Sequence, residues 1–359
     1  MLTECNCERW AEESAHRGGV GMFDPELIEC VRDAIDDSRG CVSQRAVKVK
    51  KDHVEVLGHG VIMPWDGEGN SLYLCHAEPV IESTRRTGDP PLVVAHRGAS
   101  SVEPEHSMAA YLRAISDGAD AVECDVRLTA DGNLVLVHDR RIDRTSDGSG
   151  YVSALHLDEL LQRDFSGGAS RWMDFEDPKG HEYRARVLTL DRFLSDLTAV
   201  SSTVQFSIET KHPTRYRGYV ERELAATLRK FGLGEPARDS EVQGTASQLA
   251  MRVRVMSFSY FAVRRMPKLL PEVPSVYLVD RLWPWVKSGS LPKGTSVLGP
   301  SIEVLRSHPE IVRRVHENGH EVHVWTVDEN DDVDLCLELG VDAIITNRPG
   351  AVKARITAR

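Results

Sequence analysis

The chain has 359 residues, of which 41% are hydrophobic and 28% are charged, an ordinary balance for a globular protein. Its 55 acidic and 44 basic residues give a net charge of −11, which argues against binding to nucleic acid or to an anionic membrane surface. No apolar run approaches the roughly 20 residues of a membrane span, and the first residues do not resemble a signal peptide. We therefore expect a cytoplasmic protein with one large domain or two smaller ones.

The first quarter of the chain differs from the rest. Asp24 and Pro25 predict the start of a helix, and the stretches 45–63 and 71–81 predict strands around the turn "DGEGN". Five of the seven cysteines lie here, without a recognisable zinc-ligand spacing, so free thiols are favoured over a zinc site. We predict an N-terminal extension at 1–81, a small α+β module of unknown role. The polar segment 82–91, which ends in two prolines, is predicted as a linker to a barrel domain at 92–359.

A regular alternation of apolar runs and helical patterns begins after this linker. Eight runs are predicted as strands: 92–96, 120–128, 204–210, 252–258, 275–280, 296–300, 321–327 and 342–346. Eight strands alternating with helices fit a (β/α)₈ TIM barrel, whose usual size is ~250 residues. The alternative is a doubly wound open sheet, although no G-x-G-x-x-G follows the first strand. Residues 140–186 interrupt the alternation and predict an inserted loop region with a short helix near 155–161, placed to shape a pocket.

Carboxylates occur at alternate positions of two predicted strands. In "AVECDVRL", Glu123 and Asp125 point to one face, and in "FSIETK", Glu209 and Lys211 share a face. Buried carboxylates are costly unless they are paired or bind a cation. Three oxygen donors that converge at the mouth of one barrel would suit Mg²⁺ or Ca²⁺ better than zinc.

The tetrapeptide "AHRG" occurs twice in the chain. The copy at 95–98 closes the first predicted barrel strand, which places His96 and Arg97 at the catalytic face. The copy at 15–18 follows a polar stretch, so its residues are predicted to lie on the surface. A second histidine, His138, ends a strand that returns after an Asp-Gly turn. Two histidines, a cation site, Arg97 and Lys211 indicate phosphoryl transfer on a phosphodiester by general acid–base catalysis.

Residues 92 to about 352 resemble the glycerophosphodiester phosphodiesterase family. The matching stretches are "AHRGASSVEPEHSMAAY", "GADAVECDVRLTADGNLVLVHD", "LTLDRFL", "FSIETK", "VHVWTVD" and "GVDAIITNRPG". The resemblance implies a (β/α)₈ barrel that splits glycerophosphodiesters into glycerol 3-phosphate and an alcohol. The residues that it implies are metal ligands Glu123, Asp125 and Glu209, an acid–base pair His96 and His138, and substrate-binding residues Arg97, Lys211 and Trp325.

The chain departs from the pattern of the family at three places, which comprise four residues. His106 and Ser107 replace the usual Asn-Thr, Asp328 stands where Asn is usual, and Asn347 stands where Asp is usual. We expect none of them to touch the catalytic residues, and we expect effects only on helix capping and on the pocket rim. A small-molecule phosphodiester is the expected partner, and the oligomeric state stays open.

Two other functions are considered. A lysophospholipase D or sphingomyelinase D type of enzyme would use the same histidines and cation on a lipid, and an exposed apolar rim would favour it. Candidates for such a rim are Trp172, Met173, Phe175, Trp283 and Trp285, although aromatic residues more often pack inside. A barrel that only binds phosphate would be expected to lack one of the two histidines.

Overall fold

The computed structural model describes residues 45–50, 53–58, 89–166, 186–234 and 252–359. The chain divides into two compact units, Met1–Val80 and Ile81–Arg359, which are described separately. In the first unit, β1 (Arg45–Lys50) pairs antiparallel with β2 (His53–Gly58). The sequence predicted 45–63 as one side of a turn at "DGEGN". The structure instead has two paired strands within 45–63. Several expected features lie outside the described residues: the helix at Asp24, the "DGEGN" turn, residues 82–88 of the linker, His16 and the five N-terminal cysteines. The domain assignment stays a prediction.

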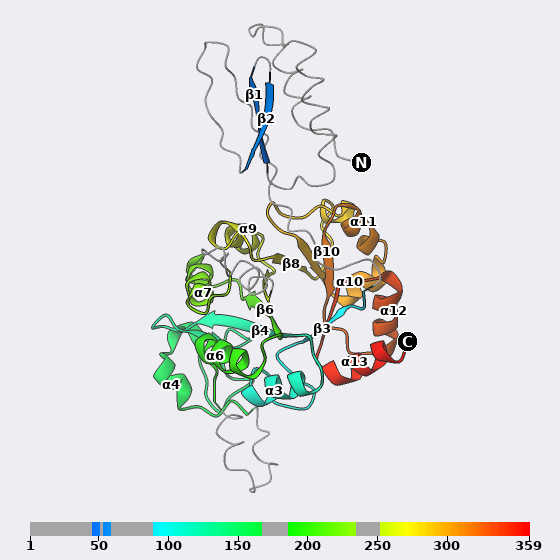
Figure 1. Cartoon of the computed structure of the whole chain (residues 1–359). Helices are drawn as coiled ribbons and strands as arrows, with labels where there is room; N and C mark the ends of the chain where they lie inside the picture. The colour runs from blue at the N-terminus through cyan, green and yellow to red at the C-terminus, as the bar shows by residue number, and fades with distance from the viewer. Residues whose placement is uncertain (1–44, 51–52, 59–88, 167–185, 235–251) are drawn as a thin grey trace. The chain divides into compact units, whose positions relative to one another are not determined.

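The second unit is a closed barrel of eight parallel strands, which confirms the predicted fold class (Figure 1). The order is β3-β11-β10-β9-β8-β7-β6-β4, and pairing of β3 with β4 closes the ring, which excludes the open sheet. The strands are β3 (Leu92–Ala95), β4 (Ala121–Leu128), β6 (Gln205–Thr210), β7 (Val253–Ser257), β8 (Ser275–Val279), β9 (Val297–Pro300), β10 (Glu321–Val324) and β11 (Ala343–Thr346). Each lies inside one of the eight apolar runs.

Helices follow the barrel strands and cover the outside of the ring. They are α3 (Met108–Ser116), α6 (Leu190–Val200), α7 (Tyr219–Lys230), α9 (Tyr260–Leu269), α10 (Ile302–Ser307), α11 (Ile311–Glu317), α12 (Asn330–Leu339) and α13 (Pro349–Thr357). Side-chain caps fix several of their starts. Ser107 accepts a hydrogen bond from the backbone N of Ala110, so the departure at this position still caps α3.

Apolar side chains fill both sides of the strands. Inside the ring, small and branched residues such as Val94, Ala121 and Val276 form one buried cluster. Between strands and helices lie two larger buried clusters, one of which includes Phe193 and Phe206. The barrel interior is therefore a packed core, and the polar residues gather at one end of it.

The region after β4 carries the predicted interruption. β5 (Leu134–Leu136) returns antiparallel to β4, as the Asp-Gly turn predicts. η1 (Val152–Ala154) and α4 (Leu157–Leu161) follow, and α4 matches the short helix that was expected. Residues 167–185, with Trp172, Met173 and Phe175, lie outside the described part of the chain.

Candidate active site

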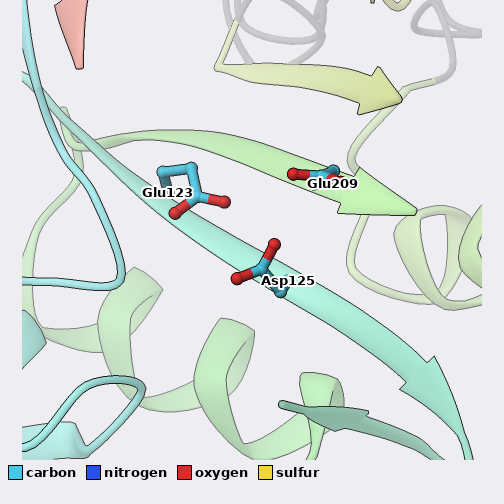
Figure 2. A group of neighbouring side chains, drawn as sticks. All are labelled: Glu123, Asp125 and Glu209. Atoms are coloured by element: carbon cyan, nitrogen blue, oxygen red, sulfur yellow. The ribbon is translucent and has the colours of Figure 1, made fainter. Parts of the chain in front are cut away.

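Three buried carboxylates meet where β4 and β6 run side by side. The register pairs Asp125 directly with Glu209, and Glu123 lies two residues earlier on β4. One oxygen from each residue lies within 4.8 Å of the other two, and the residues are only 1%, 1% and 7% exposed. Figure 2 shows the three side chains projecting into the same space. The sequence pattern predicted this convergence, and the structure brings the three acids together.

Two basic residues border this acidic cluster. Lys211 Nζ lies 2.8 Å from Glu209 Oε1 and 3.2 Å from Asp125 Oδ1. Arg97 Nε lies 3.2 Å from Asp125 Oδ2, and the Arg97 backbone N donates to Glu123 Oε2 over 2.9 Å. Three acids face two bases, and the buried Asp125 Oδ1 has the ion pair with Lys211 but no well-aligned hydrogen bond. An all-oxygen donor set with an excess negative charge fits a hard cation such as Mg²⁺ or Ca²⁺.

Burial separates the pKa values of the three acids. For Glu209, burial and the charge of Asp125 raise the pKa to about 8. Burial and Asp125 also raise the pKa of Glu123 well above its usual value. Burial opposes the charge of Asp125 too, but Lys211, His106 and Arg97 lower its pKa well below the usual value. The cluster therefore holds protons that a cation would displace.

His96 follows β3 and is oriented through an amide. Asn347 Oδ1 lies 2.7 Å from His96 Nδ1, and Asn347 Nδ2 donates to Asp328 Oδ2 over 2.6 Å. Because the Asp328 carboxylate only accepts, the amide oxygen must face the histidine, so His96 Nδ1 carries the proton. The neutral ring then has its lone pair on Nε2. Burial and the charge of Arg97 lower the pKa of His96 to about 4, so the ring is neutral near pH 7.

His138 follows β5 and has a charged partner instead. Its Nδ1 lies 2.7 Å from Asp139 Oδ1, and Arg144 Nε lies 2.6 Å from the other oxygen of Asp139. Burial opposes the charge of Asp139, but Arg144 and His138 lower its pKa to about 2, so it is ionised. Burial lowers the pKa of His138 below its usual value, and the charge of Asp125 and the hydrogen bond to Asp139 oppose that shift only in part. An adjacent carboxylate stabilises an imidazolium ion, which an amide oxygen does less well.

The expectation that the three departures avoid the catalytic residues is wrong. His106, which is 5% exposed, has Nε2 3.0 Å from Asp125 Oδ2 and Nδ1 2.8 Å from the Tyr111 hydroxyl. Asn347 contacts His96, and Asp328 orients Asn347. These contacts join loops after β3, β10 and β11, which only closure of the barrel brings together. In the sequence, the only sign of these residues was that each differs from the residue usual in the family.

Trp325 follows β10 and lies next to the site rather than in the acidic cluster. Its Nε1 donates to the Gly299 carbonyl over 2.7 Å, and its ring packs edge-on against Phe258. The Phe258 ring in turn lies 5.9 Å below Lys211 Nζ. Trp325 is thus connected to Lys211 through the ring of Phe258.

Two cavities border these residues. The first, called the His96 cavity here, has about 350 Å³ and is lined by His96, Arg97, Ser100, Glu105, Asp328 and Asn347, among others. The second has about 250 Å³ and contains Lys211 in its wall. Histidines, cations and a cluster of carboxylates beside two cavities can bind a phosphodiester and transfer protons to and from it.

Known proteins are similar to this chain in sequence. The glycerophosphoryl diester phosphodiesterase family matches residues 96–351. A Mycobacterium tuberculosis protein named "Probable glycerophosphodiester phosphodiesterase 1" is 44% identical over 264 residues, which cover 74% of this chain and 92% of that protein. A glycerophosphodiester phosphodiesterase of Bacillus subtilis is 28% identical over 260 residues, covering 72% of this chain and 84% of that protein.

Solved structures share the fold. A glycerophosphodiester phosphodiesterase from Parabacteroides distasonis has a TM-score of 0.59 at 26% identity and covers 76% of this chain and 98% of its own. A phosphodiesterase from Oleispira antarctica, solved with the product sn-glycerol-3-phosphate, has a TM-score of 0.60 at 22% identity and covers 75% and 97%. The barrel and its polar end define a phosphoric diester hydrolase. The chain belongs to the glycerophosphoryl diester phosphodiesterase family.

Proposed function

We propose that this protein hydrolyses glycerophosphodiesters to glycerol 3-phosphate and an alcohol, with one divalent cation, Mg²⁺ or Ca²⁺. The observation that carries the proposal is the buried cluster of Glu123, Asp125 and Glu209, flanked by Arg97 and Lys211. When bound, a cation supplies Lewis acidity toward a hydroxyl and a phosphate oxygen. Arg97 and Lys211 would hold the charge that builds on the phosphoryl oxygens.

The hydrogen-bond partners support different roles for the two histidines. His96, with its unprotonated Nε2, takes the proton of the glycerol hydroxyl next to the phosphoester, and this oxygen attacks phosphorus. His138, paired with ionised Asp139, donates a proton to the departing alcohol oxygen as the P–O bond breaks. A cyclic phosphate results. Water then opens the ring while His138 removes its proton and His96 returns one to the glycerol oxygen.

Metal removal tests the cation requirement. We expect protein dialysed exhaustively against chelator to lose turnover of glycerophosphocholine, and Mg²⁺ or Ca²⁺ to restore it. Glu123→Gln should weaken the restoration by raising the cation concentration needed, with unchanged circular dichroism. The matched control is Asp196→Asn, which alters a carboxylate that pairs with Arg192 on the surface of α6. Full turnover in excess chelator would overturn the cation part of the proposal.

The leaving group tests the role of His138. His138→Ala should reduce kcat about 10²–10⁴-fold on glycerophosphocholine, because the alkoxide of choline needs a proton to depart. The loss should be much smaller on a diester with a nitrophenol leaving group, which departs without a proton. His308→Ala, at a half-buried histidine at the end of α10, is the control. Equal losses on both substrates would contradict the assignment of His138 as the acid.

One observation favours a lipid substrate as the second candidate. Exposed aromatic rings gather in the segments that follow β7 and β8, at the carboxyl ends of these strands; they are Phe258, Tyr260, Phe261, Trp283 and Trp285. Tyr260 contacts both Phe261 and Trp285, so these rings form one apolar rim. Such a rim could hold an acyl chain, as a lysophospholipase D would need. A lysolipid cleaved with a higher kcat/KM than glycerophosphocholine would support this candidate.

A further inference from the structure

The cavity beside Lys211 has a strongly basic lining. Arg127, Arg140, Arg215 and Lys211 contribute to its wall, and no acidic side chain of the described residues lines it. We call it the arginine cavity. The protein as a whole carries a net charge of −11, so this local positive charge is opposite in sign to the charge of the whole protein. Four bases around a cavity of about 250 Å³ provide the positive charge that a small anion needs.

The arginine cavity lies on the His138 side of the acidic cluster. Arg127 donates from Nε and Nη2 to the His138 carbonyl oxygen over 3.0 and 2.7 Å, and Arg140 follows His138 by two residues. Lys211 joins the cavity to Asp125 and Glu209. By contrast, His96 lines the other cavity. An in-line displacement places the attacking and leaving oxygens on opposite sides of phosphorus, so the two cavities correspond to the two halves of a diester.

Arg215, which is farther from the reacting atoms, is held in place by neutral partners. Arg215 donates to the Ser153 carbonyl and to the Tyr216 hydroxyl, and its guanidinium stacks 4.9 Å from the Tyr216 ring. Neither partner neutralises its charge. A guanidinium presents a planar fork of donors that matches carboxylate or phosphate oxygens. The lining therefore offers charge and geometry for a planar or tetrahedral oxyanion.

We infer that the arginine cavity selects phosphodiesters whose leaving alcohol carries a second anionic group, a carboxylate or a phosphate. This inference rests on the proposed function, because it concerns the alcohol that leaves in that reaction. His138 then protonates the leaving oxygen while Arg140 and Arg215 bind the distal anion. The cationic choline group would be the poorest occupant of this cavity.

Three synthetic diesters of glycerol 3-phosphate test the inference. Their leaving alcohols are glycolamide, glycolate and 2-hydroxyethyl phosphate, of which the first two have nearly the same shape and differ by one charge. We expect kcat/KM for the glycolate diester to exceed that for the glycolamide diester about tenfold, the usual effect of one charge-assisted hydrogen bond. The phosphate arm shows whether the cavity prefers a carboxylate or a phosphate.

The variant Arg140→Gln/Arg215→Gln should reduce the ratio of anionic to neutral kcat/KM to about one, since both distal charges are lost. Arg313→Gln, at an exposed arginine that pairs with Glu317 on α11, should keep the wild-type ratio. Raising the salt concentration should also reduce the ratio in the unchanged protein, which needs no variant to fold.

The outcomes separate the two proposals. Efficient hydrolysis of all three diesters without a preference, or a preference that persists in the double variant, would overturn the inference and leave the proposed function intact. Failure to hydrolyse any glycerol diester with the cation present would overturn the proposed function, and the inference with it.

Discussion

At the scale of single residues, two positions decide how His96 works. Asn347 presents an amide oxygen to His96, and the carboxylate of Asp328 is one residue farther from the ring. The usual pattern of the family has Asn at the position of Asp328 and Asp at the position of Asn347. The exchange keeps the hydrogen bonds but moves the negative charge away from the histidine. Burial and Arg97 then dominate, and the pKa of His96 falls to about 4.

Reversing this exchange should shift the pH dependence of activity. In Asp328→Asn/Asn347→Asp, a carboxylate next to His96 raises the pKa of the ring, by about one unit or more. Because the base must be unprotonated, the acidic limb of kcat/KM should move to higher pH. Asp328→Asn alone adds no charge beside His96 and should not move the limb upward. An unchanged acidic limb in the double variant would contradict the role of His96 as the base.

At the scale of elements, the pairing of β4 with β6 fixes the acidic cluster. The register sets Asp125 beside Glu209, so the backbone itself brings two carboxylates together. His106, in the loop before α3, and Lys211, after β6, then contact Asp125 from two sides. Without a cation this arrangement costs free energy of folding at pH values above 4.5, the usual pKa of a glutamate, because burial and Asp125 raise the pKa of Glu209 in the folded protein.

The metal-free protein should lose stability as the pH rises. Burial and Asp125 raise the pKa of Glu209 from 4.5 to about 8. The folded state therefore keeps a proton that the unfolded chain releases above pH 4.5, and up to about 1.4 kcal/mol per pH unit of unfolding free energy is lost between these values. Asp125, with its lowered pKa, titrates below this window. Urea unfolding at pH 5, 6.5 and 8 in chelator measures the slope.

Glu209→Gln should reduce this slope, and the part that remains comes from Glu123, whose pKa burial and Asp125 also raise. Mg²⁺ or Ca²⁺ should restore stability most at pH 8, where the cation competes with the fewest protons. An equal slope in Glu209→Gln and in the unchanged protein would show that other groups cause it.

At the scale of the whole molecule, the barrel unit supplies all of the described site residues, which fall between His96 and Asn347. The N-terminal unit contributes none of them, although it contains the first copy of "AHRG". In the part of the chain that the structure describes, no helix is long and apolar enough to cross a membrane.

A chain that begins at Pro90 should therefore retain the kcat of the full chain on glycerophosphocholine. His16→Ala in the full chain should also retain it, because the first "AHRG" follows no strand of the barrel. Steady-state kinetics and circular dichroism measure both. A large loss of kcat with a native circular dichroism spectrum would show that the N-terminal unit completes the site or controls access to it.

Local patterns made the barrel strands predictable. Each barrel strand lies in a short run rich in apolar residues, which polar side chains interrupt at single positions, as in β4 and β6. Such a run is visible without any knowledge of its neighbours. Helices with long apolar stripes, such as α6 and α7, were visible for the same reason. The same spacing is hard to see in three other helices, because α9 contains Pro267, α10 has only six residues and α13 has few apolar positions.

The sequence by itself determined the eight strands, the shared face of Glu123 and Asp125, and the place of His96 and His138 at strand ends, because alternation along a strand is a local property. The tertiary structure alone decided which distant loops touch. It placed His106 on Asp125, Asn347 on His96, and Arg127 and Arg215 around one cavity. The two histidine contacts depend on closing the ring between β3 and its neighbours β4 and β11, and the cavity depends on the pairing of β4 with β6. No local pattern encodes the distances between loops that these pairings set.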